Sequence, residues 1–375
     1  MLDARSVDFM YTSKDSGKLY MAAASDRLSR LFSFTNNDIT KAILHSTITY
    51  TNTGGFYWNT LACDGEKMTC IDGTDRLWHT RYTFNSRLGT EYFRNPGFQQ
   101  SSSTGPQSWY RLKKVPNRDY AIAGVGDHLI SDNIFPSKVV RVNYAMLANE
   151  IKEFSFNTEE TLIDISVFKL DTDTFFLTVS DSNTGNYLYK IYDHTSSNAA
   201  AVHTHTSTPS PASDDTRPRC LDFSWSGADQ MIRVEKNGKF VLSQGFKTLT
   251  SINDQISYTI PAAAMANEVV WVPQTDLAVI STFSGSVIFT SAISDQKQDK
   301  IHIVQHANNN LVRLYTIPRT PSVAVLFFKA GDSRLQLYTI SQIGCSNPLA
   351  LTCQAQDLSK SLTCKPNSQL KNFIN

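Results

Sequence analysis

Short runs of β-branched and aromatic residues alternate with tight turns along most of the chain. The same unit, a strand, a turn and a second strand, recurs seven times. The paired strands are expected at 19–23 and 28–34, 68–71 and 77–84, 120–123 and 139–144, 175–179 and 187–192, 231–234 and 240–243, 277–282 and 287–290, and 323–328 and 335–340. Gly, Asp, Asn and Ser are frequent between the paired strands, as tight turns require. The pattern predicts a series of antiparallel hairpins.

The spacing of these hairpins predicts the architecture. Turns near positions 26, 73, 126, 183, 237, 284 and 331 lie 47 to 57 residues apart. A further strand is expected before each pair, at 7–11, 56–61, 109–115, 162–170, 221–225, 269–272 and 311–317, and a fourth at 47–50, 151–156, 201–204, 256–260 and 301–304. Four antiparallel strands per repeat of about 50 residues form a propeller blade. We therefore expect an all-β, seven-bladed β-propeller of four-stranded antiparallel blades over residues 1–343; two unrelated β domains are the alternative.

Three segments depart from the repeat. The last unit lacks a fourth strand, and we expect residues near Leu349 to Cys353, or the first residues of the chain, to supply it, because an unpaired edge would expose a strand ladder. Residues 194–217 are rich in Ser, Thr, Ala and Pro, which predicts a loop between the fourth and fifth units. Residues 143–153 are the stretch with helical character, and we expect them to lie between blades.

The resemblance to known propellers is one of architecture. No Trp-Asp or Gly-His pair marks the units as in WD40 proteins, the kelch double glycine occurs once at Gly54-Gly55, and the repeated box of sialidases is not found. The segment Tyr57-Trp58-Asn59-Thr60 is similar to the YWTD motif of lipoprotein-receptor propellers, which that family repeats in most blades. The chain thus resembles a divergent seven-bladed propeller. Residues 344–375 form a Cys-containing tail that resembles the opening of Cys-rich repeats in protist cell-surface proteins, which implies a cell-surface setting.

Composition narrows the function classes. The 375 residues are 41% apolar and 11% aromatic, enough for a sizeable core, and the formal net charge is +1. No basic run is long enough to follow a phosphate backbone, so we expect no nucleic-acid partner. The longest apolar run, residues 323–328, is far too short to span a membrane, and residues 1–20 contain no apolar stretch of signal-peptide length.

The cysteines bear on the compartment. Cys63 and Cys70 flank the expected turn at 64–67 and form the candidate disulfide, and an even count of six cysteines favours an oxidising compartment. No Asn lies in an Asn-x-Ser/Thr sequon, which points the other way. We expect an extracellular or cell-surface location, with a cytoplasmic one as the alternative.

Signatures of catalysis and of metal binding are missing. There is no Gly-x-Ser-x-Gly elbow and no glycine-rich phosphate loop, so we assign no catalytic residue and no cofactor. His203 and His205 share one face of a strand, with His194 nearby, but no third ligand is adjacent, and we expect loop histidines and no metal. The segment 181–185 resembles the start of a calcium loop, but lacks its closing Glu and predicts a hairpin turn.

Aromatic residues recur near the first strand of several units. Packing between blades is the ordinary role of such residues. Tyr57, Trp58, Trp109 and Tyr110 are the candidates that, exposed at a blade rim, could instead stack on a glycan or anchor a protein partner.

These observations favour a non-enzymatic binding or scaffolding module that contacts a protein or glycan in a larger extracellular or cell-surface assembly. The alternatives are a glycan-processing hydrolase on a propeller scaffold and an intracellular propeller adaptor. A hydrolase would bring two or three carboxylates with perturbed pKa values to the channel mouth. A scaffold would show an apolar patch on a face or rim.

Overall fold

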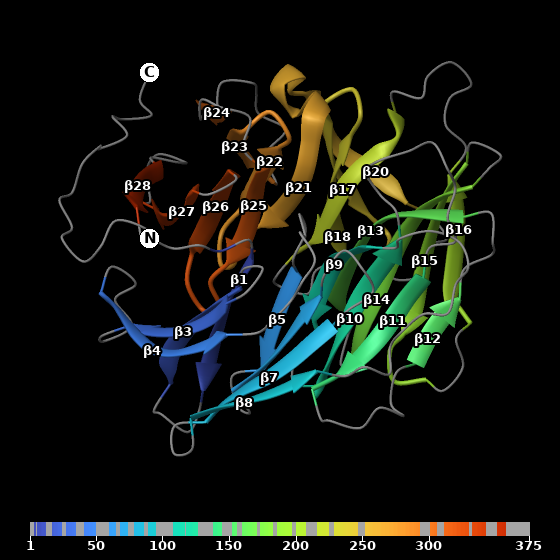
Figure 1. Cartoon of the computed structure of the whole chain (residues 1–375). Helices are drawn as coiled ribbons and strands as arrows, with labels where there is room; N and C mark the ends of the chain where they lie inside the picture. Colours follow the sequence, from blue (N-terminus) through green and yellow to red (C-terminus); the bar gives the residue numbers. More distant parts are fainter. Residues whose placement is uncertain are drawn as a thin grey trace.

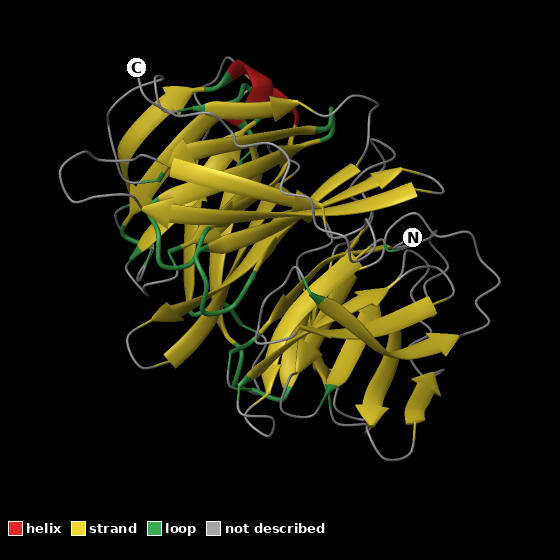
Figure 2. Ribbon diagram, turned by 90° about the vertical axis from the view of Figure 1, so that its left-hand side faces the viewer, coloured by secondary structure: helices red, strands yellow, loops and turns green. Residues whose placement is uncertain are grey.

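Hydrogen-bonded β-strands make up nearly all of the regular structure. The computed structural model describes residues 4, 6–12, 17–24, 28–34, 41–49, 60–64, 68–73, 79–85, 89–94, 108–116, 118–126, 138–144, 152–155, 160–170, 173–182, 186–196, 200–207, 216–224, 229–246, 252–292, 301–305, 311–329, 332–342 and 351–357. Within these ranges, the strands form four-stranded antiparallel sheets, seven in number, each built from consecutive strands (Figures 1 and 2). The sheets form a ring that resembles a β-propeller, which confirms the expected all-β class and the four-stranded antiparallel blade.

The first four sheets are built from residues 6–207. The first sheet contains β1 (Ser6–Thr12), β2 (Lys18–Ala24), β3 (Leu28–Phe34) and β4 (Ala42–Thr49). The second contains β5 (Thr60–Asp64), β6 (Thr69–Gly73), β7 (His79–Asn85) and β8 (Gly89–Arg94). The third contains β9 (Ser108–Lys114), β10 (Tyr120–Gly126), β11 (Lys138–Asn143) and β12 (Lys152–Ser155), and the fourth β13 (Glu160–Leu170), β14 (Asp173–Ser182), β15 (Tyr187–Asp193) and β16 (His203–Ser207).

The remaining sheets follow the same order. The fifth contains β17 (Pro218–Phe223), β18 (Gln230–Glu235), β19 (Lys239–Gln244) and β20 (Asn253–Thr259). A short 3-10 helix, η4 (Pro261–Met265), leads into the sixth, which contains β21 (Ala266–Trp271), β22 (Leu277–Thr282), β23 (Ser286–Ser291) and β24 (His302–Gln305). The last contains β25 (Leu311–Thr316), β26 (Ser322–Lys329), β27 (Asp332–Gln342) and β28 (Leu351–Asp357).

The first strand of each sheet lies nearest the centre of the ring. Each of these strands contacts the first strand of the next sheet, and β25 contacts β1 (Figure 1). The middle strands are the most buried: β22 and β23 are buried at every position, whereas the outer strands β20 and β24 are partly exposed. The middle strands are apolar on both faces because each face packs on a neighbouring sheet.

Apolar layers between successive sheets form the core. One such layer joins the fifth and sixth sheets through Ile232, Phe240, Val269 and Ile280. The layer that joins the last sheet to the first contains Phe9, Met21, Leu326 and Leu335, and the Tyr315 hydroxyl donates to Ser6 Oγ across the same junction. Side-chain packing therefore closes the ring, with no strand shared between its two ends.

The three segments that depart from the repeat can now be compared with the structure. The fourth strand of the last sheet is β28, which pairs with β27; it overlaps the segment expected near Leu349 to Cys353 and brings residues 351–357 of the expected tail into the sheet. Within residues 194–217, expected as a loop, lies β16, which overlaps the fourth strand expected at 201–204. The helical expectation for residues 143–153 was wrong at both ends, because Asn143 lies in β11 and residues 152 and 153 lie in β12, which pairs with β11 in the same sheet. Strand pairing there outweighs local helix propensity.

The second sheet differs from expectation in one strand. Its first strand is β5 (Thr60–Asp64), and residues 56–59 of the strand expected there lie outside the described residues. Its outer strand β8 had no counterpart among the expected strands. An outer strand packs on one side only and needs less apolar sequence, so it leaves a weak pattern.

Replacing Gly238 would test how much the tight turns contribute to stability. Its φ is +81°, and a Cβ there would lie 2.3 Å from the backbone oxygen of Ile260, which directly follows the outer strand β20 of the same sheet. Gly17 has a similar φ of +76° but open space around it. We expect Gly17→Ala to cost about 1 to 2 kcal/mol through the backbone conformation alone. Gly238→Ala adds a steric overlap and should cost about 3 kcal/mol or more. Urea unfolding of the two variants measures the difference, and equal losses would contradict this account.

Candidate functional site

The central channel gathers the charged side chains of the innermost strands. A cavity of about 290 Å³ lies there, lined by residues from all seven of these strands. Acidic residues occupy a recurrent place in four of them, each directly before or between apolar residues: Asp8 in β1, Asp164 in β13, Asp222 in β17 and Glu268 in β21.

Each of these four carboxylates binds the backbone of the next sheet. One oxygen accepts a hydrogen bond from a backbone N–H of the following innermost strand: Cys63 to Asp8 at 2.7 Å, Leu221 to Asp164 at 3.0 Å, Trp271 to Asp222 at 2.8 Å and Leu314 to Glu268 at 2.9 Å. We call these four contacts the inter-sheet latches. An unpaired buried N–H would be costly, so each latch stabilises the contact between two sheets.

The other oxygen of each carboxylate is also engaged. Asp8 accepts from the N–H of Phe9, and Asp164 accepts from the N–H of Ile165. Asp222 accepts from the hydroxyl of Ser166. The framework therefore satisfies both oxygens of these carboxylates.

Arg111 of β9 connects strands on different sides of the channel. Its Nε donates to Asp164 at 2.8 Å, its Nη1 to Glu268 at 3.0 Å and its Nη2 to the backbone oxygen of Asn267 at 2.7 Å. Burial alone would lower the pKa of Arg111, but the two carboxylates outweigh it and raise the pKa above the ordinary value. The guanidinium stays charged and ties the third sheet to the fourth and the sixth.

Burial perturbs two of the channel acids in the same direction. It raises the pKa of Asp8 to about 6, against the opposing effects of Lys114 and of the two N–H groups that Asp8 accepts. It also raises the pKa of Asp222, with Lys113 opposing. Burial in the channel therefore opposes the ionisation of both acids.

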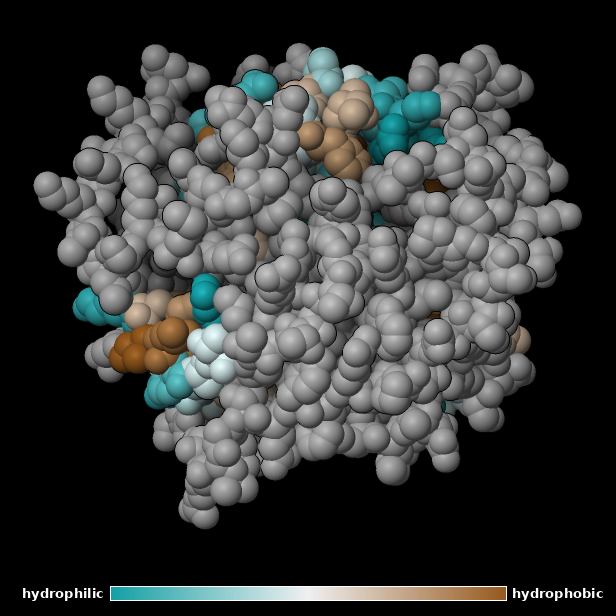
Figure 3. Space-filling view, in the orientation of Figure 1, coloured by the Kyte–Doolittle hydropathy of each residue, from teal (hydrophilic) through white to brown (hydrophobic). Residues whose placement is uncertain are grey.

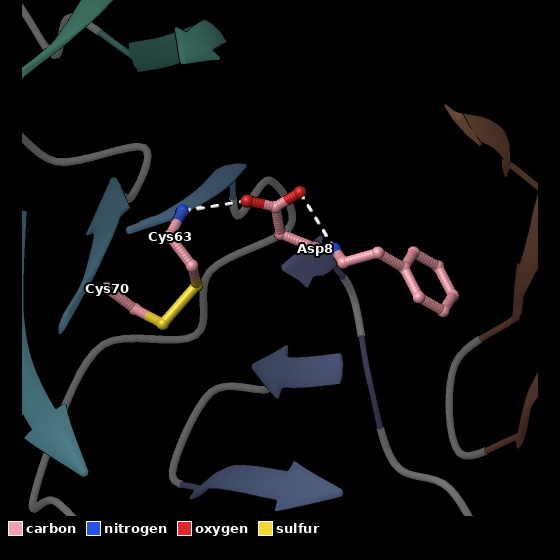
Figure 4. The surroundings of a disulfide bond; sticks show 4 residues. Asp8, Cys63 and Cys70 are labelled. Carbon is pink, nitrogen blue, oxygen red and sulfur yellow. Dashed lines mark hydrogen bonds between the residues drawn. A yellow bond between two sulfur atoms is a disulfide. The ribbon is translucent and has the colours of Figure 1, made fainter. Parts of the chain in front are cut away.

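A disulfide lies beside one latch. Cys63 and Cys70 face each other in the β5–β6 hairpin and are joined by a disulfide, as drawn in Figure 4. The N–H of Cys63 is the donor to Asp8 (Figure 4). The crosslink therefore holds the strand that supplies the first latch. Cys220 is a buried free thiol in the described part of the chain, and Cys353 lies in β28.

The aromatic candidates are only partly placed. Tyr57 and Trp58 lie outside the described residues, and Trp109 and Tyr110 lie in β9, the innermost strand of its sheet. Trp271, by contrast, is buried in the layer between the fifth and sixth sheets, and its indole N–H donates to the backbone of Thr275.

The histidines expected in the loop lie in two settings. His203 and His205 are in the outer strand β16, where His205 packs against the ring of Tyr189. His194 is buried and hydrogen-bonds to the Tyr120 hydroxyl. Within the described ranges, no group of three or more His, Cys, Asp or Glu side chains could hold a metal ion.

Sequence reasoning missed the four channel acids and Arg111. The signal for the acids was present, because an acid flanked by apolar residues stands in the first strand of the first, fourth and fifth units as Val-Asp-Phe, Ile-Asp-Ile and Leu-Asp-Phe. An acid at one inward position of several repeats indicates a shared role. Arg111 had no such signal, since its partner Glu268 is 157 residues away.

Comparison with known proteins supports the fold alone. No family model matches the chain, and no curated protein matches it. Among solved structures, the chain is similar to Chaetomium thermophilum Raptor, with a TM-score of 0.60 and 10% identity over 91% of this chain. The match spans only 28% of the Raptor chain. What the two share is the fold. No helix in the described residues is long and apolar enough to cross a membrane.

The Arg111 contacts can be tested by removing the charge. Arg111→Met leaves Asp164 and Glu268 without their cation inside the channel, and we expect a loss of about 3 kcal/mol in the free energy of unfolding. Lys114→Met changes an exposed side chain of the same strand and should change stability by less than about 0.5 kcal/mol. Denaturant unfolding of both variants provides the comparison. A loss of under about 1 kcal/mol for Arg111→Met would show that the bridge is dispensable.

The raised pKa of Asp8 predicts that the free energy of unfolding depends on pH. Its pKa is about 6 in the folded protein against an ordinary value of 3.8, so the folded state holds the proton more tightly. The stabilisation is fully present below pH 3.8 and is lost as the pH rises through about 6. Asp8→Asn removes this dependence, so relative to the parent the variant should gain up to about 3 kcal/mol between pH 4 and pH 7. Urea unfolding of both proteins across this range measures it; parallel pH profiles would refute the assignment.

Proposed function

We propose that the chain is a single seven-bladed propeller that acts as a non-enzymatic protein-interaction scaffold in an extracellular or cell-surface assembly. The observation that carries the proposal is the use of the channel carboxylates. Asp8, Asp164, Asp222 and Glu268 are the acids that a channel enzyme would need, and each one holds a backbone N–H of the next sheet.

A glycan-processing hydrolase is the second candidate, favoured by one specific observation. Asp8 and Asp222 line the channel cavity, and burial raises the pKa of both. Raised pKa values are typical of a general acid. Yet the same inter-sheet latch recurs at Asp164 and Glu268, and a framework position repeated around a ring supports a structural role. We therefore favour the scaffold.

The outer strand β4 offers a candidate contact surface. The side chains of Ile43 and Leu44 are 50% and 52% exposed. The register between β3 and β4 shifts at Leu31 and Phe32, and such irregularities re-aim side chains. Figure 3 shows a hydrophobic area on the left, over the part of the molecule that contains β4, with hydrophilic surface around it. An apolar segment on an outer strand suits a protein partner that adds a strand or covers the edge.

The disulfide supports the extracellular part of the proposal. Structural disulfides persist in oxidising compartments and are uncommon in the cytosol. Cys63–Cys70 closes a hairpin in the framework and lies next to the Asp8 latch, which is the place of a structural crosslink. An intracellular adaptor remains the alternative if this pair is reduced in the native protein.

The scaffold proposal is tested with a charge inserted into the β4 surface. Capture of partners by the immobilised chain from its native source is compared with capture by Ile43→Asp/Leu44→Asp. The matched control is Val202→Asp/Ile303→Asp, which alters exposed apolar residues elsewhere, one directly before β16 and one in β24. We expect the main bound protein to bind at least about tenfold more weakly to the β4 variant, a change of about 1.4 kcal/mol, and normally to the control.

The hydrolase alternative is tested on the same preparations. The purified chain is incubated with a panel of glycans, and released sugars are measured for the parent and for Asp8→Asn. Turnover by the parent that Asp8→Asn abolishes would establish the enzyme and overturn the scaffold proposal.

In the capture experiment, an equal loss of partner binding in the Val202→Asp/Ile303→Asp control would remove β4 as the contact surface.

A further inference from the structure

The channel cavity contains cations that the framework does not use. Lys113 and Lys114 of β9 both line it, the first half-buried and the second exposed. Within the described residues, neither ammonium group has a hydrogen bond or an ion pair. Their interactions with the channel acids are electrostatic only, Asp222 with Lys113 and Asp8 with Lys114.

The formal charges of the residues that line the cavity do not show that these two lysines lack hydrogen-bond partners in the described part of the chain. Four acids and four bases line the cavity, so the formal charges cancel. The acids, however, already accept hydrogen bonds from backbone N–H groups, from Ser166 and from Arg111. Three donor groups of Arg111 are likewise committed to Asp164, Glu268 and Asn267. Arg313, the fourth base, hydrogen-bonds to the Tyr315 side chain. Of the four cations that line the cavity, Lys113 and Lys114 are therefore the two that have no hydrogen bond within the described residues.

We propose that the central channel binds a small free anion that carries a phosphate or carboxylate group, held by Lys113 and Lys114. Ammonium groups are point-charge donors that suit such oxygens. The cavity volume of about 290 Å³ admits a small ligand and not a folded segment. A divalent cation fits this wall poorly, because the carboxylate oxygens it would need already serve the inter-sheet latches.

The site is independent of the β4 surface. A small anion enters the channel, whereas a partner at Ile43 and Leu44 binds the outer edge of the first sheet. Either proposal can fail without the other.

Calorimetric titration of the full chain with inorganic phosphate, pyrophosphate and citrate tests the site, at an ionic strength held constant with sodium chloride. We expect saturable binding of at least one of these probes to the parent protein. In Lys113→Met/Lys114→Met the dissociation constant should rise at least tenfold. In Lys113→Arg/Lys114→Arg, which keeps both charges, binding should persist within about threefold, since guanidinium groups also bind such anions.

The matched control removes two positive charges elsewhere. Lys169 is exposed near the end of β13 and Lys239 begins β19, and neither lines the cavity. Lys169→Met/Lys239→Met should bind like the parent, and circular dichroism checks that every variant is folded. The proposal is overturned if no probe binds the parent, or if the control loses as much affinity as the channel variant. An equal affinity in the Lys113→Met/Lys114→Met protein overturns it as well.

Discussion

A carboxylate buried near the axis of a ring needs hydrogen-bond donors, and this need shapes the centre of the molecule. Asp8, Asp164, Asp222 and Glu268 each find their donor on the innermost strand of the next sheet. The apolar layers between sheets supply most of the burial, but they are not directional. The inter-sheet latches are directional, and at these four junctions they fix the position of one innermost strand along its neighbour.

Arg111 also links sheets through hydrogen bonds, but between sheets that are not all neighbours. It joins β9 to β13 through Asp164 and to β21 through Glu268 and Asn267. One guanidinium thus pairs with two carboxylates that already accept N–H groups, and its positive charge offsets part of the negative charge of both. The junction between the last and first sheets relies instead on apolar packing and on the Tyr315 contact with Ser6.

The same hydrogen bonds distinguish the channel groups that hold the sheets together from those that are available to a ligand. Acids in a cavity with raised pKa values are a familiar sign of catalysis. Here their oxygens are occupied, and the recurrence of the latch in four sheets explains both their position and their burial. What remains available in the cavity is positive charge at Lys113 and Lys114, while the exposed apolar side chains lie elsewhere, on outer strands such as β4.

The sequence by itself determined the local structure. Alternating apolar runs and turn residues predicted most inner and middle strands, since strand formation and tight turns depend on neighbours within a few residues. The turn between Cys63 and Cys70 placed these two residues opposite each other for the same reason. The outer strand β8 was not predicted. At residues 143 and 152, the strands expected at 139–144 and 151–156 proved correct and the helical expectation for 143–153 wrong, because pairing with a neighbouring strand decides the structure there and local propensity does not.

Only the tertiary structure decided which groups meet in the channel. The latch donors lie 55, 57, 49 and 46 residues beyond their acceptors, about one repeat, so the recurrent acids contained a signal that periodicity alone did not interpret. Arg111 meets Glu268 across 157 residues because the ring brings the third and sixth sheets to one axis. The closure of that ring fixes which charges are satisfied and which remain free, and no local pattern encodes that outcome.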